Sequence, residues 1–503
     1  MSETLVGQAR LQEMLGLRVP PAFVVSTCGK GARRTIEGLK SQREHYPARY
    51  MPEDSIAGQL RFALRYEPLD MGVMAAAFRT IGPDPIAKMV RDEPNGSVAR
   101  RAWFLYETLT GRRLDVPDAG TVTYVDALDP DLHIVCDQVR SPRHKVFDNL
   151  LGTGEFCLTV RRTDRIRRRQ AEDLSRVAGD MIAETSPDIL ARANRYLMAK
   201  ETKSSFEIER EKPSPQRASR FINALENATS FDPTSLASLV DLQNAIVDPR
   251  FAATGLRDFQ NFVGETMGDH REKVHFICPK PGDIADLTRS WTGMTRRLGG
   301  TDPVVAAALI SSTFVFLHMF EDGNGRISRF LVHSTLSSRG FTPEHAIFPV
   351  SAAIVRDPRG YDDALESFSK PLFDYMDWKM TPQREVEVLS ETDHLYRYFD
   401  ATPQVEFLFD KVANTIETDL KEEITYIVKF DAAMKAINDV VDMPNKDAML
   451  LARLLLQNGG TLSNKKRVDH FAMLNDADVK AIEASLADTV AIDDPAPMAM
   501  SGP

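Results

Sequence analysis

Two segments near the middle of the chain have the hydrophobic spacing of helices. In residues 304–317 apolar side chains recur every three or four positions, with further apolar residues between them, which is typical of a helix buried on all sides. A second, mostly apolar stripe follows a glycine-rich stretch, and Gly340 supplies a helix stop. Its members are Ile327, Phe330, Leu331 and Thr335. The pattern therefore predicts a helix, a tight loop and a second helix.

The same periodicity predicts further helices on both sides of this centre. Residues 56–66 and 98–110 have helical spacing, whereas the stretch from 122 to 135 and residues 156–160 are rich in β-forming side chains. We expect a mainly α fold: a helical core with a short β-hairpin, and helical accessory domains on both sides. The expected parts are a mainly helical N-terminal domain with a few strands at 1–200, the core at 201–380, a C-terminal helical domain at 385–486 and a flexible tail at 487–503.

The loop between the two central helices has the residues of an anion-binding site. Gly323 and Gly325 can take positive φ without penalty, which would let consecutive backbone N–H groups turn inward as a cup beside the positive end of the following helix. Arg326 and Arg329 are three residues apart on the first turn of that helix, and guanidinium groups match phosphate oxygens well. This pattern favours a phosphate ligand.

Two titratable residues precede the cup. His318 has an ordinary pKa of about 6.5, so an imidazole at this point is suited to take a proton from a hydroxyl nucleophile. Asp322 provides the single carboxylate that Mg²⁺ prefers beside phosphate oxygens and waters. The other interpretations are an ordinary Asp-Gly or Asn-Gly turn, a buried structural histidine, solvated helix arginines and a metal pair of His318 with Glu321 or Asp322. A tetrahedral zinc set is not evident in the sequence.

Residues 318–329 match His-x-Phe-x-Asp-Gly-Asn-Gly-Arg-x-x-Arg and so resemble the signature of Fic domains, with Met319 where proline is more usual. The typical activity of that family is transfer of AMP from ATP to a Tyr, Ser or Thr hydroxyl of a target protein, with release of pyrophosphate. The resemblance implies a Fic-type helical core. It assigns the base to His318, the Mg²⁺ ligand to Asp322, an α-phosphate contact to Asn324, the phosphate cradle to Gly323, Gly325 and Arg326, orientation of the γ-phosphate to Arg329, and a core anchor to Phe320.

An upstream segment resembles the inhibitory helix of many Fic proteins. Ser205 and Glu209 fit the pattern Ser/Thr-x-x-x-Glu. In the family this glutamate pairs with the second arginine of the signature, here Arg329, and blocks the γ-phosphate. A carboxylate on the guanidinium competes with phosphate by charge. Arg210 departs from the family pattern, which has Gly or Asn at this position, so either the helix end or its contact to ATP is expected to differ. A charged glutamate on a surface helix is the alternative interpretation of Glu209.

A third segment resembles the flap on which Fic domains seat the target. Val274, His275, Phe276 and Ile277 are β-rich, and they precede Cys278-Pro279 and a turn. A short hairpin with an open edge can accept a target segment as an added strand. Residues 255–257, Gly-Leu-Arg, resemble the segment that leads into this flap. An ordinary hairpin is the alternative interpretation.

Composition narrows the class of protein. The chain has 503 residues, 43% of them hydrophobic, and a formal net charge of −10, so we do not expect nucleic acid as a general partner. The arginines of residues 161–169 are interpreted as a solvated helix start, with an acidic partner as the alternative. Met1–Thr4 does not resemble a signal peptide, no apolar run reaches the ~20 residues of a membrane span, and four scattered cysteines suit a reducing compartment. We expect a cytoplasmic protein.

The sequence thus predicts a protein adenylyltransferase that uses ATP and Mg²⁺ and is autoinhibited by Glu209. Its partner would be a target protein hydroxyl, with self-modification and a homodimer left open and no membrane partner. One alternative is another Fic-type transfer: a different nucleotide, a kinase-like reaction or removal of AMP. The other is a nucleotide-sensing regulatory module whose C-terminal bundle binds a partner or DNA, since residues 450–456, 465–471 and 479–486 resemble a helix-turn-helix.

Overall fold

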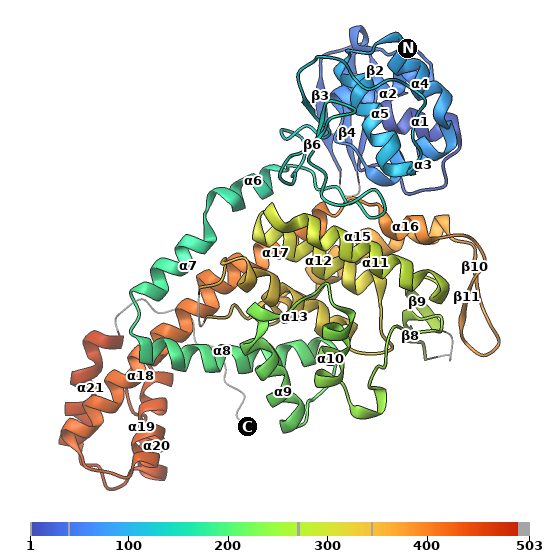
Figure 1. Cartoon of the computed structure of the whole chain (residues 1–503). Helices are drawn as coiled ribbons and strands as arrows, with labels where there is room; N and C mark the ends of the chain where they lie inside the picture. The colour runs from blue at the N-terminus through green and yellow to red at the C-terminus, as the bar shows by residue number, and fades with distance from the viewer. Residues whose placement is uncertain (1–2, 39–40, 269–271, 344–345, 491–503) are drawn as a thin grey trace. The chain divides into compact units, whose positions relative to one another are not determined.

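The computed structural model in Figure 1 describes residues 3–38, 41–268, 272–343 and 346–490. Most of the predicted tail at 487–503 lies outside the described residues. The chain forms two compact units. Unit 1 contains Met1–Asp173, Thr202–Phe341 and Val350–Val412, and unit 2 contains Leu174–Glu201, Thr342–Pro349 and the chain from Ala413 onward. Residues 1–173 of the predicted N-terminal region therefore share one unit with most of the predicted core, whereas residues 174–200 belong to unit 2.

Unit 1 begins with a small mixed sheet covered by helices. Its strands lie in the order β1-β2-β4-β3, with β2 and β4 parallel and the outer pairs antiparallel. Helices α2 and α5 confirm the two helices predicted near residues 56 and 98, and both contribute to a hydrophobic core around Trp103. The elements are β1 (Thr4–Val6), α1 (Gly7–Leu15), β2 (Val24–Gly29), β3 (Arg34–Glu37), β4 (Gln42–Pro47), α2 (Ile56–Tyr66), α3 (Met71–Ile81), α4 (Pro83–Asp92) and α5 (Ser97–Thr110).

The β-rich stretch after α5 forms much less sheet than its composition predicts. A small sheet contains β5 (Val125–Asp126), β7 (Val146–Asp148) and β6 (Val139–Ser141), in that order, and helix α6 (Asp164–Ala171) follows. Residues His133 and Thr159 make only isolated bridges. Most of the segment 111–163 is therefore an irregular chain packed on the helices.

The remainder of unit 1 is a helical assembly around α12 (Pro303–Leu317). The side chain of Asp302 caps this helix by accepting from the N–H groups of Val304 and Val305, and nearly every residue of α12 is buried. Helices α11 and α13 pack against it. The other elements are α9 (Pro215–Glu226), α10 (Leu236–Ile246), β8 (Phe262–Thr266), β9 (Glu272–Ile277), α11 (Pro281–Arg297), α13 (Asn324–Ser338), α14 (Val350–Val355), α15 (Pro358–Leu372), β10 (Trp378–Met380), β11 (Val386–Val388), α16 (Asp393–Arg397) and α17 (Thr402–Asn414). The prediction of a mainly α fold is confirmed.

Unit 2 has its own hydrophobic core. Helices α18, α19 and α21 contribute to one buried cluster that includes Leu451 and Ile482, and Phe471, directly after α20, belongs to it as well. An ion pair also lies within this unit, with Nζ of Lys200 2.6 Å from Oδ1 of Asp419. The helices are α7 (Leu174–Ala183), α18 (Lys421–Val440), α19 (Asn445–Gln457), α20 (Asn464–His470) and α21 (Asp476–Val490), and the chain of α8 (Pro187–Ile208) passes from unit 2 into unit 1. Helices α19 to α21 cover the three segments predicted as a bundle.

Three of the arginines within residues 161–169 bind carboxylates far away in the sequence but in the same unit. Arg161 pairs with Asp400 at 2.6 Å, Arg169 with Asp410 at 2.8 Å, and Arg165 with the same Asp410. These three arginines are therefore not merely the solvated charges that the sequence suggested, because Asp400, two residues before α17, and Asp410, within α17, are their partners.

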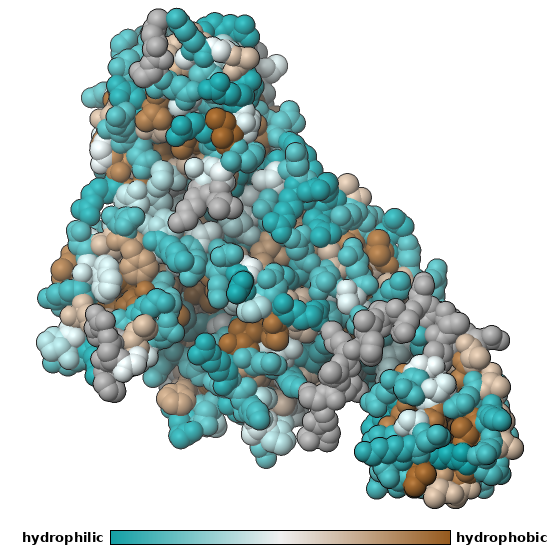
Figure 2. Space-filling model, turned by 180° about the vertical axis from the view of Figure 1, so that it is seen from behind, coloured by the Kyte–Doolittle hydropathy of each residue, from teal (hydrophilic) through white to brown (hydrophobic). Residues whose placement is uncertain are grey.

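The surface and the interior of the chain are ordinary for a globular protein. Figure 2 shows a mostly hydrophilic face with hydrophobic side chains in small scattered groups. Cys28, Cys136, Cys157 and Cys278 are all buried with free thiols. Within the described ranges, no helix has the combination of length and apolar character that crossing a membrane requires.

Candidate functional site

His318 directly follows the last residue of α12 and caps the end of this helix. His318 takes the left-handed conformation with φ +51°, and its backbone N–H donates to the carbonyl of Phe314 at 3.1 Å. The ring atom Nδ1 lies 3.1 Å from the carbonyl of Val315, so Nδ1 carries the proton and Nε2 is left as an acceptor. Burial, and to a smaller extent the positive charge of Arg257, lower the pKa of His318 to about 4. The imidazole is therefore neutral near pH 7 and able to take a proton.

Asn324 holds the loop that follows His318. Its Oδ1 accepts from the N–H of Phe320 at 3.0 Å, and its Nδ2 donates to the carbonyl of the same residue at 2.8 Å. The side chain is 2% exposed. Asn324 thus fixes the shape of the loop in this structure, while its predicted contact to an α-phosphate stays a prediction.

The two glycines of the loop are required by close packing. Gly323 has φ +92°, and a Cβ atom there would lie 2.9 Å from Cγ1 of Val247. A Cβ atom at Gly325 would collide with Oε1 of Glu209. The backbone next to the first turn of α13 is therefore open to a group of the size of a carboxylate or a phosphate oxygen, and Glu209 occupies that place here.

Arg329 is held by the segment that resembles an inhibitory helix. Its guanidinium is nearly buried, with a side-chain exposure of 3%. Nη2 donates to Oε1 of Glu209 and to the carbonyl of Ser205, both at 2.7 Å, and Nε donates to the hydroxyl of Ser205 at 3.0 Å. The structure thus brings together the three residues that the sequence pattern related to one another.

Arg326 is engaged by a second carboxylate, which the sequence interpretation missed. Nη1 donates to Oε2 of Glu211 at 3.0 Å, and Nη2 donates to Oδ1 of Asp322 at 2.6 Å. The guanidinium also lies over the ring of Phe206, 5.3 Å from its centroid. Glu211 and Glu209 therefore bind the two arginines of the signature, one each. The available signal was a second acidic residue just beyond Glu209.

The end of helix α8 positions these two carboxylates. The N–H of Arg210 donates to the carbonyl of Glu207 at 2.9 Å, and the N–H of Glu211 donates to the carbonyl of Phe206 at 3.0 Å. Arg210 has φ +57°, so the helix ends in a Schellman-type turn with a non-glycine residue in the left-handed position. This finding explains physically why glycine or asparagine suits that position in the family pattern.

Asp322 is suited to hold a magnesium ion together with a substrate. Its side chain is 37% exposed, and Oδ1 accepts from Arg326 and from the N–H of Gly323, both at 2.6 Å. In the part of the chain that the structure describes, no three His, Cys, Asp or Glu side chains are grouped as a metal site. A single carboxylate is nevertheless what Mg²⁺ uses when phosphate oxygens and waters complete its coordination, so the residues present fit this ion.

The predicted flap is an antiparallel hairpin of β8 and β9. The register shifts after Val263, which pairs with Phe276, while Gly264 pairs with Val274, so His275 forms a bulge. Phe276 and Ile277 are buried, whereas Val274 and His275 are half-buried. Phe276 packs near the rings of Phe316, Phe368 and Tyr396. The buried end anchors the hairpin, and among the described residues β8 and β9 pair only with each other, which leaves strand edges free.

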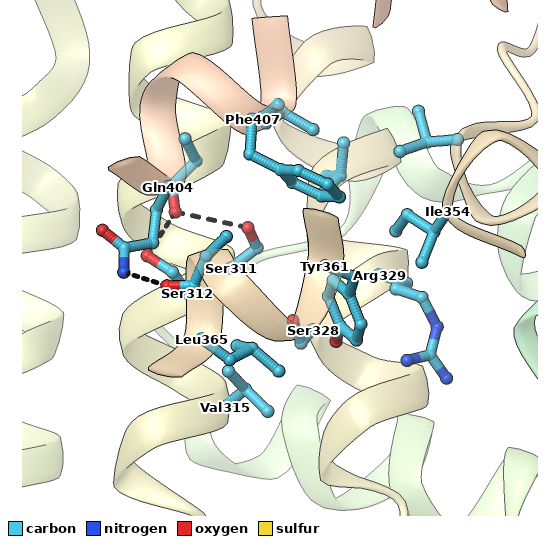
Figure 3. Close-up of a pocket in the computed structure, with 15 residues that line it drawn as sticks. Ser311, Ser312, Val315, Ser328, Arg329, Ile354, Tyr361, Leu365, Gln404 and Phe407 are labelled. Atoms are coloured by element: carbon cyan, nitrogen blue, oxygen red, sulfur yellow. Dashed lines mark hydrogen bonds between the residues drawn. The ribbon is translucent and has the colours of Figure 1, made fainter. Parts of the chain in front are cut away.

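A small cavity lies against Arg329 on the inner side of the site. Its volume is about 60 Å³, which is room for a few water molecules and not for a nucleotide. Figure 3 shows Ile354, Tyr361 and Phe407 around this cavity, with the guanidinium of Arg329 pointing away from it. Tyr361 and Leu365 are part of its wall, in agreement with a packing role.

Comparisons with known proteins agree with these features. The sequence model of the Fic/DOC family matches residues 233–336. Protein adenylyltransferase fic-1 of Caenorhabditis elegans is 28% identical over 136 residues, which make up 26% of this chain and 25% of that protein. This chain therefore spans about a quarter of the length of that curated relative.

The chain also has a distant likeness to two solved structures. A Fic family protein from Desulfovibrio desulfuricans has a TM-score of 0.38 and 19% identity, over 59% of this chain and 87% of that one. A Fic domain containing signaling protein from Bacteroides thetaiotaomicron has a TM-score of 0.36 and 16% identity, over 52% of this chain and 97% of that one. The segment matched by the family contains the whole signature from His318 to Arg329. Residues 233–336 of this chain, which include the loop and both arginines of the site, are therefore similar to a Fic domain.

Proposed function

We propose that this protein transfers AMP from MgATP to a Ser, Thr or Tyr hydroxyl of a target protein. The observation that carries the proposal is a neutral histidine, His318, with Nε2 available as acceptor. Its loop leads directly into α13, whose start has a glycine-lined place for an anion and two buried arginines. The name of the relative with 28% identity, a protein adenylyltransferase, supports the same reaction. The match to the Fic/DOC family supports a Fic-type transfer, and AMP as the transferred group is our more specific proposal.

The proposed reaction is an in-line displacement at the α-phosphorus. The acceptor oxygen forms a bond to phosphorus while the bond from phosphorus to the bridging oxygen of pyrophosphate breaks. The proton of the hydroxyl passes to Nε2 of His318, and pyrophosphate leaves with the electron pair of the broken bond. Arg326 and Arg329 would bind phosphate oxygens in place of their present carboxylates. Magnesium held at Asp322 would add positive charge beside the phosphates.

We further propose that the protein is autoinhibited by Glu209. Its carboxylate occupies Arg329, the residue expected to orient the γ-phosphate, and it also fills the space beside Gly325. The end of α8 must therefore shift before a triphosphate binds productively. Ser205 contributes to the same contact through its hydroxyl and carbonyl oxygens.

Labelled ATP tests the proposal directly. The full-length Glu209→Gly variant is incubated with Mg²⁺ and ATP labelled at the α- or γ-phosphate, with bacterial lysate proteins as acceptors. Label from the α-phosphate is expected on protein, and His318→Ala should lower this signal by about 10²- to 10⁴-fold. Label from the γ-phosphate alone would indicate kinase-like transfer instead. No His318-dependent label from either position would contradict the proposal.

The other candidate activities differ in what they require. Transfer of a different nucleotide would appear as labelling with that nucleotide and not with ATP, and removal of AMP would appear as loss of label from modified protein. A purely regulatory module would keep its biological effect in His318→Ala. Four buried free cysteines support the proposal that the protein works in the reducing cytoplasm.

A further inference from the structure

Arg257 sends a charged side chain into the interior beside the site and is 6% exposed. Its guanidinium donates to three backbone carbonyls: Nε to His318 at 2.7 Å, Nη1 to Phe259 at 2.7 Å and Nη2 to Pro279 at 2.6 Å. Its own backbone N–H donates to the carbonyl of Met319 at 3.0 Å. Phe259 precedes β8 and Pro279 follows β9, so a single residue contacts both the catalytic loop and the two ends of the hairpin.

The chemistry of arginine suits this junction. Its planar guanidinium presents five N–H donors in a fixed fork, so it holds three acceptors in defined directions, whereas a lysine ammonium is a single flexible point of charge. Burial lowers the pKa of Arg257, but the group stays charged near neutral pH, and the carbonyl dipoles compensate that charge. His318, with φ +51°, is in a backbone conformation that costs a residue other than glycine roughly 1 kcal/mol, and the bond to its carbonyl helps to hold it.

Two other side chains hold the base of the hairpin. The hydroxyl of Tyr396 donates to the carbonyl of Ile277 at 2.7 Å, and Nε2 of Gln260 donates to the carbonyl of Cys278 at 2.8 Å. Among the described residues, the hydrogen bonds of these two side chains do not reach His318 or Met319. They secure the hairpin, but Arg257 is the group that also ties it to the base.

We propose that Arg257 is a positioning residue that keeps the acceptor flap in register with His318 through its bonds to His318, Phe259 and Pro279. This inference rests on the proposed function, because it assigns the flap to the acceptor. A hydroxyl placed on the hairpin then reaches Nε2 at a fixed distance, and losing about 1 Å of that placement can lower a transfer rate by about 10²-fold. Transfer of AMP to water needs no seat on the flap, so Arg257 matters less for that side reaction.

The ratio of AMP transferred to protein to AMP released by hydrolysis measures how strongly Arg257 couples the hairpin to His318. The full-length Glu209→Gly protein, alone and combined with Arg257→Lys or Arg257→Ala, is given Mg²⁺ and α-labelled ATP with lysate proteins as acceptors. Both substitutions are expected to lower protein labelling by about 10²-fold and to change the release of free AMP by less than about 5-fold. The matched control is Tyr396→Phe, which removes a flap bond and leaves Arg257 in place, and it should preserve this ratio.

Amide hydrogen exchange gives a second measurement that does not depend on activity. In Arg257→Lys, peptides spanning residues 257–268 and 272–280 and the peptide spanning 314–324 should all exchange faster. In Tyr396→Phe, faster exchange should be confined to the hairpin peptides. A thermal unfolding scan of each variant separates a local change from loss of the fold.

The outcomes distinguish a failure of the positioning role of Arg257 from a failure of the proposed function. Equal loss of protein labelling and AMP release in the folded Arg257→Lys variant, or unchanged exchange in residues 314–324, would overturn the positioning role while leaving AMP transfer intact. Absence of His318-dependent labelling in the Glu209→Gly parent would instead overturn the proposed function. The exchange experiment would still report whether Arg257 couples the loop to the hairpin.

Discussion

The two sides of the site differ in what occupies them. On the nucleotide side, Glu209 and Glu211 bind Arg329 and Arg326, and both guanidinium groups are almost completely buried. On the acceptor side, the hairpin of β8 and β9 keeps free strand edges in the described structure, and its outer residue Val263 is 42% exposed. Under the proposed function, control acts on nucleotide binding, while the surface for the acceptor is already formed.

The largest expected effect lies on the nucleotide side. Glu209→Gly removes a charged hydrogen bond to a buried arginine, an interaction worth about 1.5–3 kcal/mol, so AMP transfer should rise about 10- to 100-fold. Adding Glu211→Gln should raise it further, because the second carboxylate also competes for a phosphate-binding arginine. The rates are measured with α-labelled ATP.

Glu207→Gly is a suitable control for the first change, because this residue is also an exposed glutamate of α8. It tests whether weakening of the helix alone raises activity. If Glu209→Gly and Glu207→Gly activated the protein equally, the specific role of the Glu209 carboxylate would be contradicted.

A smaller effect is expected on the acceptor side. In the Glu209→Gly background, Val263→Asp places a charge on the exposed part of β8 and should reduce protein labelling about 3- to 10-fold, with unchanged release of AMP to water. Val468→Asp, at an exposed valine of α20, is the matched control and should leave labelling unchanged. An equal fall in AMP release would show that the hairpin belongs to the nucleotide side as well.

A still smaller effect on the transfer rate is expected from the turn at the end of α8, which positions Glu209 and Glu211. Arg210→Gly relieves the left-handed strain at this position by about 1 kcal/mol, which stabilises the inhibited helix end. Residual transfer by the otherwise wild-type protein should therefore fall, by about 5-fold at most. Arg210→Ala, which keeps the strain, should leave the rate near that of the wild type. A higher rate in Arg210→Gly than in Arg210→Ala would be evidence against this turn as part of the inhibition.

The smallest expected effect is that of pH between 5 and 8. Because the pKa of His318 is lowered to about 4, the imidazole is neutral over this range and loses its capacity as a base only as pH falls through about 4. The value of kcat/KM for ATP in Glu209→Gly should therefore show no acid limb attributable to His318 above pH 5. A fall of kcat/KM as pH decreases through about 6.5 would mean that the histidine is solvated in the active conformation.

The chemistry of the loop could be predicted from the sequence because it is local. Gly323 and Gly325, the base and the two arginines all lie within twelve consecutive residues, and the flanking hydrophobic spacing fixed the helices. The pairing of Arg329 with Glu209, 120 residues away, came from the family resemblance. Glu211 had no comparable pattern, and for Arg257 the resemblance gave only a place ahead of the flap. Their contacts to Arg326 and His318 join residues 115 and 61 positions apart, so the sequence did not indicate them.

The N-terminal sheet was less predictable for a different reason. All four residues of β3 are exposed, so the strand lacks the alternation by which a half-buried strand is recognised. Its pairing with β4, and the parallel pairing of β4 with β2, bring together segments that are separate in the sequence. The partners of Arg161 and Arg169 are likewise 239 and 241 residues away, which is why the arginine cluster was interpreted as solvated.

Intact-mass spectrometry of the full-length Glu209→Gly protein after exposure to MgATP tests the central claim most directly, with Glu209→Gly/His318→Ala treated in parallel. The account predicts a mass increase of one or more AMP groups on the protein itself or on an added acceptor protein, absent from the double variant. The same added AMP in both proteins, or a phosphate in its place, would contradict the assignment of His318 as the base for AMP transfer.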